Sequence, residues 1–576
     1  TPVPAGSFPG PGTQIIAGVA QRLAPAGASN PFNPFNQDIA DGTRARLAEF
    51  GNRVIQNETD AFMFSAGIKG ENVAGRWNFD ATFSYSSIGS DTRNRLTSAS
   101  RFNEILNASS PIFDPRSPSY IGTTVPYNPF GFYRNPIANN LALADYARVN
   151  LRYVDKSTLG QVSFVASTAE LWKLPAGSVG FALGGDFRRE QLEQDSNASS
   201  TGSDVIGESP RAVSVAQRKI GGVFAEGRLP MYRGVEGSAS VRHEKFFSSR
   251  RDTTVPKFAL RVRPFGNQLT LRTSYSKGFR EPSLYELYSS PISAQTPIQD
   301  PRDGFVEPEQ PITLRGNRNL RPEKTDYFNA GFVWSPTVLR FKGLSLGADW
   351  WEITRKGTVE ANPQYTLYRA FGLVPGGMLA GESVFFNNSG SIASVNSVFF
   401  NVGRTKVSGW DFSGGYQLPT DRLGRWELTT VWTMIRRFDR SSVEGVPLIS
   451  VLGQDSTGSG ENGYLKWRGF VRLNWTFKGF SVQGSGNYTD GFEDEALNGE
   501  PFQVADRIMV DGQVSYAFRR NHGRWLRDTK VTLGGRNLLD RDPPLALGGG
   551  RNGEGYPSHL YTSENMFWYT SVSRKF

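Results

Sequence analysis

Segments of about ten residues in which apolar and polar side chains alternate recur along most of this 576-residue chain. In residues 77–86 the odd positions hold Trp, Phe, Ala, Phe and Tyr, and the even positions hold Asn, Asp, Thr, Ser and Ser. Successive side chains of a β-strand point to opposite faces, so each such segment predicts a strand with one apolar and one polar face. The pattern returns in residues 465–477 and 508–518, and again at the end of the chain, where Phe576 closes an alternating segment.

Two architectures accommodate strands of this kind. A soluble β-sandwich turns its apolar faces into a core, whereas a membrane barrel turns them toward lipid. The apolar faces here carry Trp, Phe and Tyr near the strand ends, as the aromatic girdles of a membrane barrel do, and the polar faces carry Arg, Asp and Gln. The longest apolar runs fall far short of the ~20 residues that a membrane helix needs. The pattern therefore favours an all-β fold, a transmembrane antiparallel β-barrel.

The connections between the predicted strands are an independent test. Short links alternate with long connections along the chain, with one shorter exception near 248–252. The short links are 70–75, 174–177, 229–237, 263–267, 336–343, 419–424, 477–479 and 519–527. The long connections are 89–158, 190–214, 279–323, 356–400, 438–463, 491–506 and 540–564. Tight periplasmic turns and long extracellular loops are the pattern of outer-membrane barrels.

The number of predicted strands is odd. About seventeen strands follow residue 57, and the first and last both run toward the short links. Two parallel neighbours cannot close an all-antiparallel barrel, and bacterial single-chain barrels have even strand numbers. We therefore expect at least one strand before residue 57, with 13–22 and 45–53 as candidates, and interpret the chain as lacking its N-terminal part. Residues 1–56 are assigned to an extracellular loop with a possible barrel strand, and residues 57–576 to the barrel domain.

Residues that carry catalytic and metal chemistry are scarce. The chain has no Cys and three histidines, His243 in a predicted strand, His522 in a short turn and His559 in a long loop. Metal or triad chemistry requires such groups to converge, so we predict no catalytic residue, no metal and no cofactor. The formal charge of +10 comes from Lys and Arg spread evenly along the chain, so we predict no nucleic-acid partner.

Five short motifs follow one another along the barrel pattern. They are Ser274–Tyr288 (SYSKGFREPSLYELY), Gly316–Asp326 (GNRNLRPEKTD), Val407–Asp411 (VSGWD), Gly535–Asp540 (GRNLLD) and the terminal Phe576. Together and in this order they resemble the TonB-dependent outer-membrane receptors, and the resemblance covers residues 57–576. The stretch Asn30–Phe35 (NPFNPF) is also similar to large receptors of this type.

The resemblance implies a barrel of about 22 strands, of which 17 to 18 are visible, with an N-terminal plug and a TonB-engaging segment that this chain does not show. It implies energy-coupled uptake of a scarce, large ligand across the bacterial outer membrane. The implied partners are outer-membrane lipid, TonB through the plug, and the barrel-assembly machinery, for which Phe576 at a periplasmic C-terminus is the signal. The ligand stays open among a siderophore, cobalamin, an oligosaccharide and a peptide.

Two other functions remain as alternatives. A passive porin-like channel requires a water-filled lumen with an inward constriction loop, and the long connections and the motifs argue against it. A membrane-embedded hydrolase requires a Ser–His pair on the barrel wall, where His243 is the sole strand histidine. The chain is therefore predicted not to be an enzyme.

Two sets of residues are candidates for ligand contact. The aromatic set lies in a long connection and consists of Tyr127, Phe130, Phe132 and Tyr133. Such rings can stack on sugars or planar ligands, although aromatic residues at a membrane interface also have a structural role. The basic set lies on the predicted polar face and consists of Arg261, Arg263 and Arg272. These side chains favour an anionic ligand or pair with plug carboxylates.

The motif residues themselves are predicted to anchor loops. Pro322 fixes its own φ and forces Arg321 into an extended conformation, which marks the start of a strand at Glu323. Asn537 and Asp540 flank a strand end, where short polar side chains can cap free backbone groups.

Overall fold

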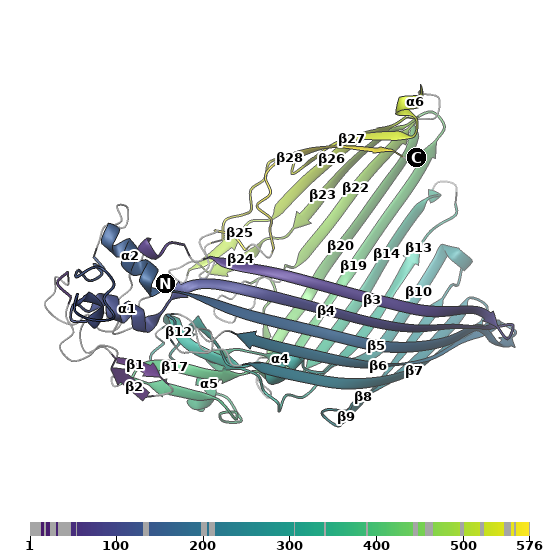
Figure 1. The fold of residues 1–576 in the computed structure, drawn as a ribbon. Helices are drawn as coiled ribbons and strands as arrows, with labels where there is room; N and C mark the ends of the chain where they lie inside the picture. The colour runs from purple at the N-terminus through teal and green to yellow at the C-terminus, as the bar shows by residue number, and fades with distance from the viewer. Residues whose placement is uncertain are drawn as a thin grey trace.

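The computed structural model of this chain is dominated by one antiparallel β-sheet that curves into a barrel (Figure 1). The structure describes residues 13–16, 19–22, 30–32, 48–52, 54–130, 137–196, 204–206, 213–304, 306–338, 341–387, 390–401, 403–441, 447–454, 465–495, 500–518, 523–546, 555–557 and 560–574. Among these, no helix has the length and apolar character to span a membrane. The predicted all-β barrel fold is confirmed.

Seventeen strands of eight residues or more build the barrel sheet, together with the two-residue β21 (Ile449–Ser450). In chain order they are β3 (Ile55–Val73), β4 (Trp77–Thr97), β5 (Arg148–Leu174), β6 (Gly177–Ser196), β7 (Ser214–Tyr232), β8 (Val235–Phe246), β9 (Arg251–Val262), β10 (Leu269–Arg280), β13 (Glu323–Trp334), β14 (Leu344–Lys356), β19 (Arg404–Thr420), β20 (Gly424–Ser441), β22 (Trp467–Phe477), β23 (Phe480–Thr489), β26 (Arg507–Ala517), β27 (Thr529–Arg536) and β28 (Phe567–Arg574). Each pairs antiparallel with the next through sixteen pairings. These strands lie where the alternation predicted them.

The first and last strands of this order differ from the others. Sixteen antiparallel pairings leave β3 and β28 running in the same direction, and within the described residues no register joins one to the other. The side chains of β3 and β28 are exposed along nearly their whole length, on both faces of each strand. The odd strand number predicted from the sequence is therefore present in the structure.

The two segments considered as an additional barrel strand lie outside the barrel sheet. β1 (Thr13–Ile16) and β2 (Val19–Arg22) form a hairpin of their own. Strands of four residues are also too short to cross a bilayer, which takes about 9–11 residues. The described part of 45–53 contains a short 3-10 helix, η1 (Ala48–Phe50). The described residues of the two segments do not supply the strand that we expected there.

Short links and long connections lie at opposite ends of the barrel strands, as predicted, and we call these the short-link end and the long-connection end. Figure 1 shows α1 (Ala99–Leu106) and α2 (Ala138–Ala147) beyond the long-connection end, and α6 (Gly523–Leu526) at the other. The last described residue, Arg574, pairs with Thr529 near α6, so β28 ends at the short-link end. Phe576 lies outside the described residues.

Glycines with positive φ allow two of the short links to pack closely against a neighbouring strand. Gly343 has φ 92°, and a Cβ there would lie 2.1 Å from the carbonyl oxygen of Gln417 on the neighbouring strand. Gly424 has φ 80°, and a Cβ there would lie 2.4 Å from the carbonyl oxygen of Thr476. Only glycine adopts this conformation at such close backbone approach without strain.

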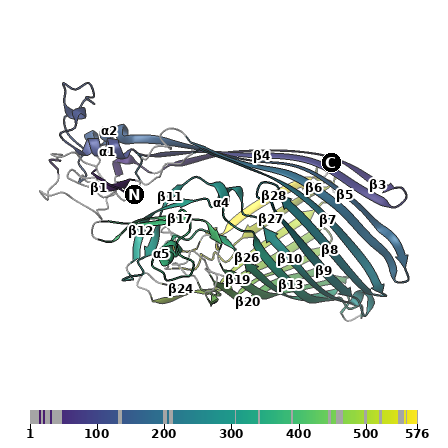
Figure 2. The ribbon, with the colours of Figure 1, turned by 90° about the horizontal axis from the view of Figure 1, so that it is seen from below.

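Hydrophobic cores lie in the long connections. One joins α1, α2 and the 3-10 helix η2 (Pro111–Phe113) around Phe102, Ile105 and Leu143. The second lies between a four-stranded sheet and a helix, which Figure 2 shows beyond the barrel strands. These elements are β11 (Ile292–Gln299), β12 (Val306–Arg315), β17 (Ile392–Val398), β16 (Ser383–Phe386) and α5 (Pro363–Ala370). A third surrounds Phe492 of β24 (Phe492–Glu495), beside β25 (Pro501–Val504).

Candidate functional site

The two faces of the barrel strands differ in chemistry. On β10, Leu271 and Tyr275 are exposed on one face, and Arg272 lies on the other. Aromatic and aliphatic side chains recur on the first face from strand to strand, and Arg, Asp and Glu recur on the second. In a membrane barrel the apolar face meets lipid and the polar face meets the interior. We therefore call them the lipid face and the lumen face.

A row of lumen-face residues crosses eight strands in direct register, and we call it the charged row. From β8 to β22 it consists of Glu236, Arg261, Arg272, Gly331, Asp349, Asp411, Thr433 and Arg468. Like charges stand directly opposite each other twice, which is unfavourable unless each charge has a partner. Arg261 and Arg272 are one such pair, and Asp349 and Asp411 are the other.

The central contact of the charged row joins Arg272 to Asp349 across the intervening strand. Arg272 Nε donates to Asp349 Oδ1 at 2.8 Å, and its Nη2 pairs with the second oxygen. Between them lies Gly331 of β13, where an added Cβ would be 2.1 Å from Asp349 Oδ1. The missing side chain at Gly331 is therefore what lets the two charges meet.

The neighbours of this contact are satisfied within the wall. Asp411 accepts a hydrogen bond of 2.7 Å from the hydroxyl of Thr433. Arg261 Nη2 lies 3.1 Å from Glu236 Oε1, and Arg228 lies 3.6 Å from the second oxygen of Glu236. The side chains of Arg261 and Arg272 still keep 45% and 50% of their surface exposed. Each arginine thus has one wall partner and one free side.

Arg263 has a different setting from the other two predicted lumen arginines. It follows the end of β9 at the short-link end, and its Nη1 donates to Asn267 Oδ1 at 3.4 Å within the same link. Its backbone N–H donates to the carbonyl of Gly234 at 2.7 Å, which joins two neighbouring short links. The structure therefore brings Arg261 and Arg272 together in one row and leaves Arg263 in a turn.

A second set of lumen-face charges, the ionic cluster, spans β6, β7 and β8. It consists of Asp186, Arg188, Glu190, Arg218, Arg242 and Glu244. Arg242 Nη2 lies 2.5 Å from Asp186 Oδ1. Between these strands lies Gly222, where a Cβ would be 2.5 Å from the same nitrogen. Glycine again lies on the middle strand beneath a charged contact. The cluster is not among the sites predicted from the sequence.

The ionic cluster is connected to the long connection that follows β10. Arg218 Nη1 donates to the carbonyl of Pro282 at 2.6 Å. From β9, Arg251 Nη1 donates to the carbonyl of Leu320 at 2.7 Å, near the other end of the same connection. Guanidinium groups of the lumen wall thus hold both ends of this connection in place.

The motif residues after β10 anchor the connection, as predicted. Arg280 Nη1 pairs with Glu286 at 2.9 Å and its Nη2 with Glu323 at 2.5 Å, which joins the two motif segments. Ser283 and Glu286 form a reciprocal capping box at the start of α4 (Leu284–Tyr288). Burial raises the pKa of the nearby Glu281 carboxyl, although Arg251 and Arg218 act in the opposite direction.

The motif after β27 also closes a strand end. Asn537 is fully buried, and its Nδ2 donates to the carbonyls of Arg541 and Glu564 at 3.1 and 3.0 Å. Asp540 Oδ1 accepts the backbone N–H of Met566 at 2.8 Å. Both residues have positive φ, 47° and 48°, which Asn and Asp tolerate better than most residues. They cap backbone groups, as the sequence predicted.

The loop aromatics do not form a common surface in the described residues. Tyr127 is 1% exposed and lies in the α1–α2 core, where its hydroxyl donates to Glu49 Oε2 at 3.0 Å. Burial, followed by the nearby Glu49 carboxylate, raises the pKa of Tyr127 well above its usual range. Ligand contact by Tyr127 stays a prediction, and in this structure its ring is enclosed. Phe130 is 43% exposed, and Phe132 and Tyr133 lie outside the described residues.

The chain is similar to known proteins over most of its length. A family model described as TonB dependent receptor-like, β-barrel, matches residues 12–538. The chain belongs to the TonB-dependent receptor β-barrel family. Proteins of this family are outer-membrane receptors, so the resemblance inferred from the five motifs is confirmed. No curated protein matches the chain in sequence.

Solved structures of such receptors share the fold. The siderophore receptor PirA from Acinetobacter baumannii is 13% identical with a TM-score of 0.52, and the match covers 87% of this chain and 62% of that one. A mutant of the ferric enterobactin receptor PfeA from Pseudomonas aeruginosa is 15% identical with a TM-score of 0.55, covering 90% and 62%. The outer-membrane transporter YddB from Escherichia coli is 10% identical with a TM-score of 0.58, covering 91% and 63%.

The chain thus spans less than two thirds of the length of these three receptors, and identities this low show the fold alone. The family is one of receptors and transporters, not of enzymes. His243, the strand histidine considered for a hydrolase, lies on the lipid face with its Nδ1 2.9 Å from the hydroxyl of Thr254.

Proposed function

We propose that this TonB-dependent receptor barrel serves energy-coupled uptake of a scarce, large ligand across the bacterial outer membrane. The observation that carries the proposal is the lumen wall, where half-exposed arginines of the charged row line an interior beneath ordered connections with their own cores. A passive porin needs an open, water-filled lumen, and elaborate connections over one end do not serve that purpose.

In this proposal the long-connection end faces outward and captures the ligand. The short-link end and the C-terminus then lie in the periplasm, since tight turns are periplasmic in such barrels. TonB acts through a plug segment of the full-length receptor, and lipid surrounds the barrel. The barrel-assembly machinery recognises the last strand with Phe576. The heat-modifiable gel migration of a chain without Phe576 tests this role, because a lower folded fraction is expected.

The lumen arginines support an anionic ligand or anionic plug groups. Arg261 and Arg272 each keep about half of their side-chain surface exposed while paired to the wall. Their guanidinium groups can therefore donate hydrogen bonds to a second carboxylate or to a phenolate. The similar PfeA structures include one in complex with enterobactin. We propose a ferric siderophore as the ligand class, with cobalamin, an oligosaccharide or a peptide as the alternatives that a transport assay would distinguish.

A transport assay on cells that express the full-length receptor tests the proposal. Uptake of radiolabelled ferric siderophore should vanish when the inner-membrane energy-coupling complex is deleted, whereas binding at the cell surface should persist. Uptake that continues undiminished without the complex would support the porin alternative instead. The double variant Arg261→Gln and Arg272→Gln should reduce uptake at an unchanged level of folded receptor. Unchanged uptake would remove these two residues from the ligand path.

A further inference from the structure

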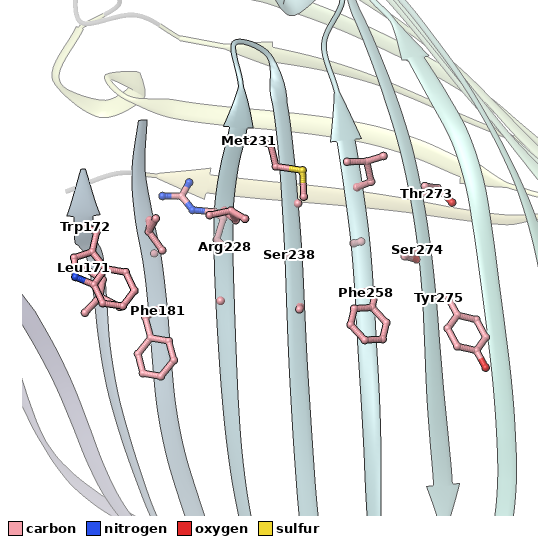
Figure 3. A pocket seen from close by; sticks show the side chains of 18 of the residues that line it. Leu171, Trp172, Phe181, Arg228, Met231, Ser238, Phe258, Thr273, Ser274 and Tyr275 are labelled. Carbon is pink, nitrogen blue, oxygen red and sulfur yellow. The ribbon is translucent and has the colours of Figure 1, made fainter. Parts of the chain in front are cut away.

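The lipid face of the barrel contains a hollow of about 750 Å³ that spans β5 to β10 and reaches β13 (Figure 3). Its lining is almost entirely apolar, from Trp172 at the end of β5 to Phe328 on β13. A volume between about 300 and 1,000 Å³ is typical of small-molecule sites. The hollow belongs to neither the charged row nor the ionic cluster, which lie on the lumen face.

The register of the strands explains how the hollow arises. One row of lipid-face residues, in order from β6 to β13, consists of Phe181, Gly227, Ala239, Phe258, Tyr275 and Phe328. Small residues on β7 and β8 form a floor, and aromatic rings on either side form walls. Figure 3 shows the rings of Phe181 and Phe258 on the two sides of this floor. One row nearer the short links, Gly237 continues the floor, and Met231 bends over it.

The hollow lies in the half of the barrel nearest the short links. Gly227 is five residues before the end of β7 at Tyr232, which places it at most ~17 Å from the short-link end, and nearer to it once strand tilt is included. Trp172, 67% exposed, lies two residues from the end of β5 and marks the level of the membrane interface. With the short links in the periplasm, this level is the periplasmic leaflet.

The lipid face requires hydrocarbon against it, because it is continuous with the apolar band that contacts the bilayer. Within a bilayer, association depends on van der Waals packing, since lipid tails are as apolar as the protein surface. A hollow left empty loses the dispersion contacts of its lining. A chain that lies along the floor between the aromatic walls recovers them.

We propose that this hollow is a binding groove for an acyl chain of a phospholipid from the periplasmic leaflet. The aromatic walls hold the chain in place, and its headgroup lies at the level of Trp172. The site is independent of the transported ligand and depends on the proposed orientation of the barrel only for the choice of leaflet.

Two matched glycine variants test the groove. A Cβ at Gly227, inside the groove, and a Cβ at Gly484, on the lipid face of β23, would each meet no atom within 4 Å. Gly227→Leu therefore fills the groove without a clash in the protein, and Gly484→Leu places the same side chain on the lipid face elsewhere. Both are made in the full-length receptor, extracted from outer membranes in mild detergent and analysed by native mass spectrometry.

The wild type and Gly484→Leu should retain phospholipid, and Gly227→Leu should retain severalfold less, with equal heat-modifiable migration as the measure of folding. If Gly227→Leu does not fold, Ala239→Leu on the next strand replaces it. Equal phospholipid retention in the groove variant and the control would overturn the proposal. So would retention of lipopolysaccharide in place of phospholipid, because that lipid belongs to the opposite leaflet.

Discussion

Two arginine–carboxylate pairs of the same chemistry lie in different regions of the molecule. In the connection that contains α5, Arg369 pairs with Glu382, and the side chains are 5% and 0% exposed. On the lumen wall, Arg272 pairs with Asp349, and the side chains are 50% and 14% exposed. Arg369 is further covered by the ring of Phe400, whose centroid is 4.5 Å from its Cζ.

The difference in burial indicates a structural role for the buried pair and leaves the exposed pair accessible to a ligand. Glu382 accepts hydrogen bonds from the hydroxyl of Thr366 at 2.8 Å and from the backbone N–H of Leu379 at 2.8 Å, besides the Arg369 guanidinium. All partners of the buried pair come from the connection itself. In the lumen pair, Arg272 and Asp349 pair with each other on the barrel wall, and half of the Arg272 side chain faces the interior. A buried pair is costly to break from one side, whereas an exposed pair contributes little to stability.

The largest effect is expected at the buried pair. Glu382→Gln leaves the Arg369 guanidinium buried without its counter-charge, which costs about 3–5 kcal/mol in comparable sites. Because α5 packs against the four-stranded sheet, hydrogen exchange should show lower protection in β11, β12, β16 and β17, with the barrel strands unchanged.

Asp300→Asn is the matched control, since it makes the same carboxylate-to-amide change directly after β11, a strand of the same four-stranded sheet. Asp300 pairs with Arg302 at 2.6 Å, but the Arg302 side chain is 43% exposed. The guanidinium lowers the pKa of Asp300, so some stability is lost in the control, at most about 1 kcal/mol. Equal loss of protection in the two variants would show that burial does not distinguish these pairs.

A smaller effect is expected at the glycine beneath the lumen pair. Gly331→Ala places a Cβ 2.1 Å from Asp349 Oδ1 and 2.6 Å from the carbonyl oxygen of Ala348, so both the side chain and the strand must shift. Overpacking of this kind costs about 1–3 kcal/mol. Denaturant unfolding of the barrel, followed by tryptophan fluorescence, measures this loss.

Gly486→Ala provides the comparison, because a Cβ there meets no atom within 4 Å. The same substitution should be neutral or stabilise by up to about 1 kcal/mol, since alanine has less conformational freedom in the unfolded chain. A loss of stability as large in Gly486→Ala as in Gly331→Ala would contradict the assigned role of Gly331.

The strands and two arginines of the charged row were predictable from the sequence, but the contacts between the site residues were not, because their partners lie far away along the chain. Alternation is a local pattern, so the segment at 77–86 identifies its own strand. The charged row depends on register, and Arg272 meets Asp349 only because two strands pair on either side of Gly331. Nothing local to Arg272 indicates that partner.

Tyr127 and the ionic cluster also show how far local sequence patterns indicate contacts between distant residues. Tyr127 was predicted on a loop surface, yet it is enclosed by residues far away in sequence, such as Phe50 and Phe102. The ionic cluster, which was not predicted, does have a local signal in the sequence. Asp186, Arg188 and Glu190 alternate at a spacing of two, which places all three charges on one face of a strand.

The smallest effect is expected at Glu281, a carboxylate that is buried like Glu382 but has no cation as close as those in the two pairs. The Glu281 side chain is 6% exposed, but its nearest cation, Arg251 Nη1, is 3.8 Å away. Burial raises its pKa, so the folded state holds the proton more tightly than the unfolded state does. Stability from this group is therefore present below its ordinary pKa of 4.5 and is lost as pH rises through the folded pKa. In Glu281→Gln that pH-dependent loss should disappear. The wild type and the variant should therefore be equally stable in acid, and the variant should be the more stable of the two toward neutral pH. Hydrogen exchange of the connection after β10, measured as a function of pH, reports this difference in stability. If the wild type gains protection relative to the variant as pH rises, then the attraction of Arg251 for the Glu281 carboxylate outweighs the effect of burial.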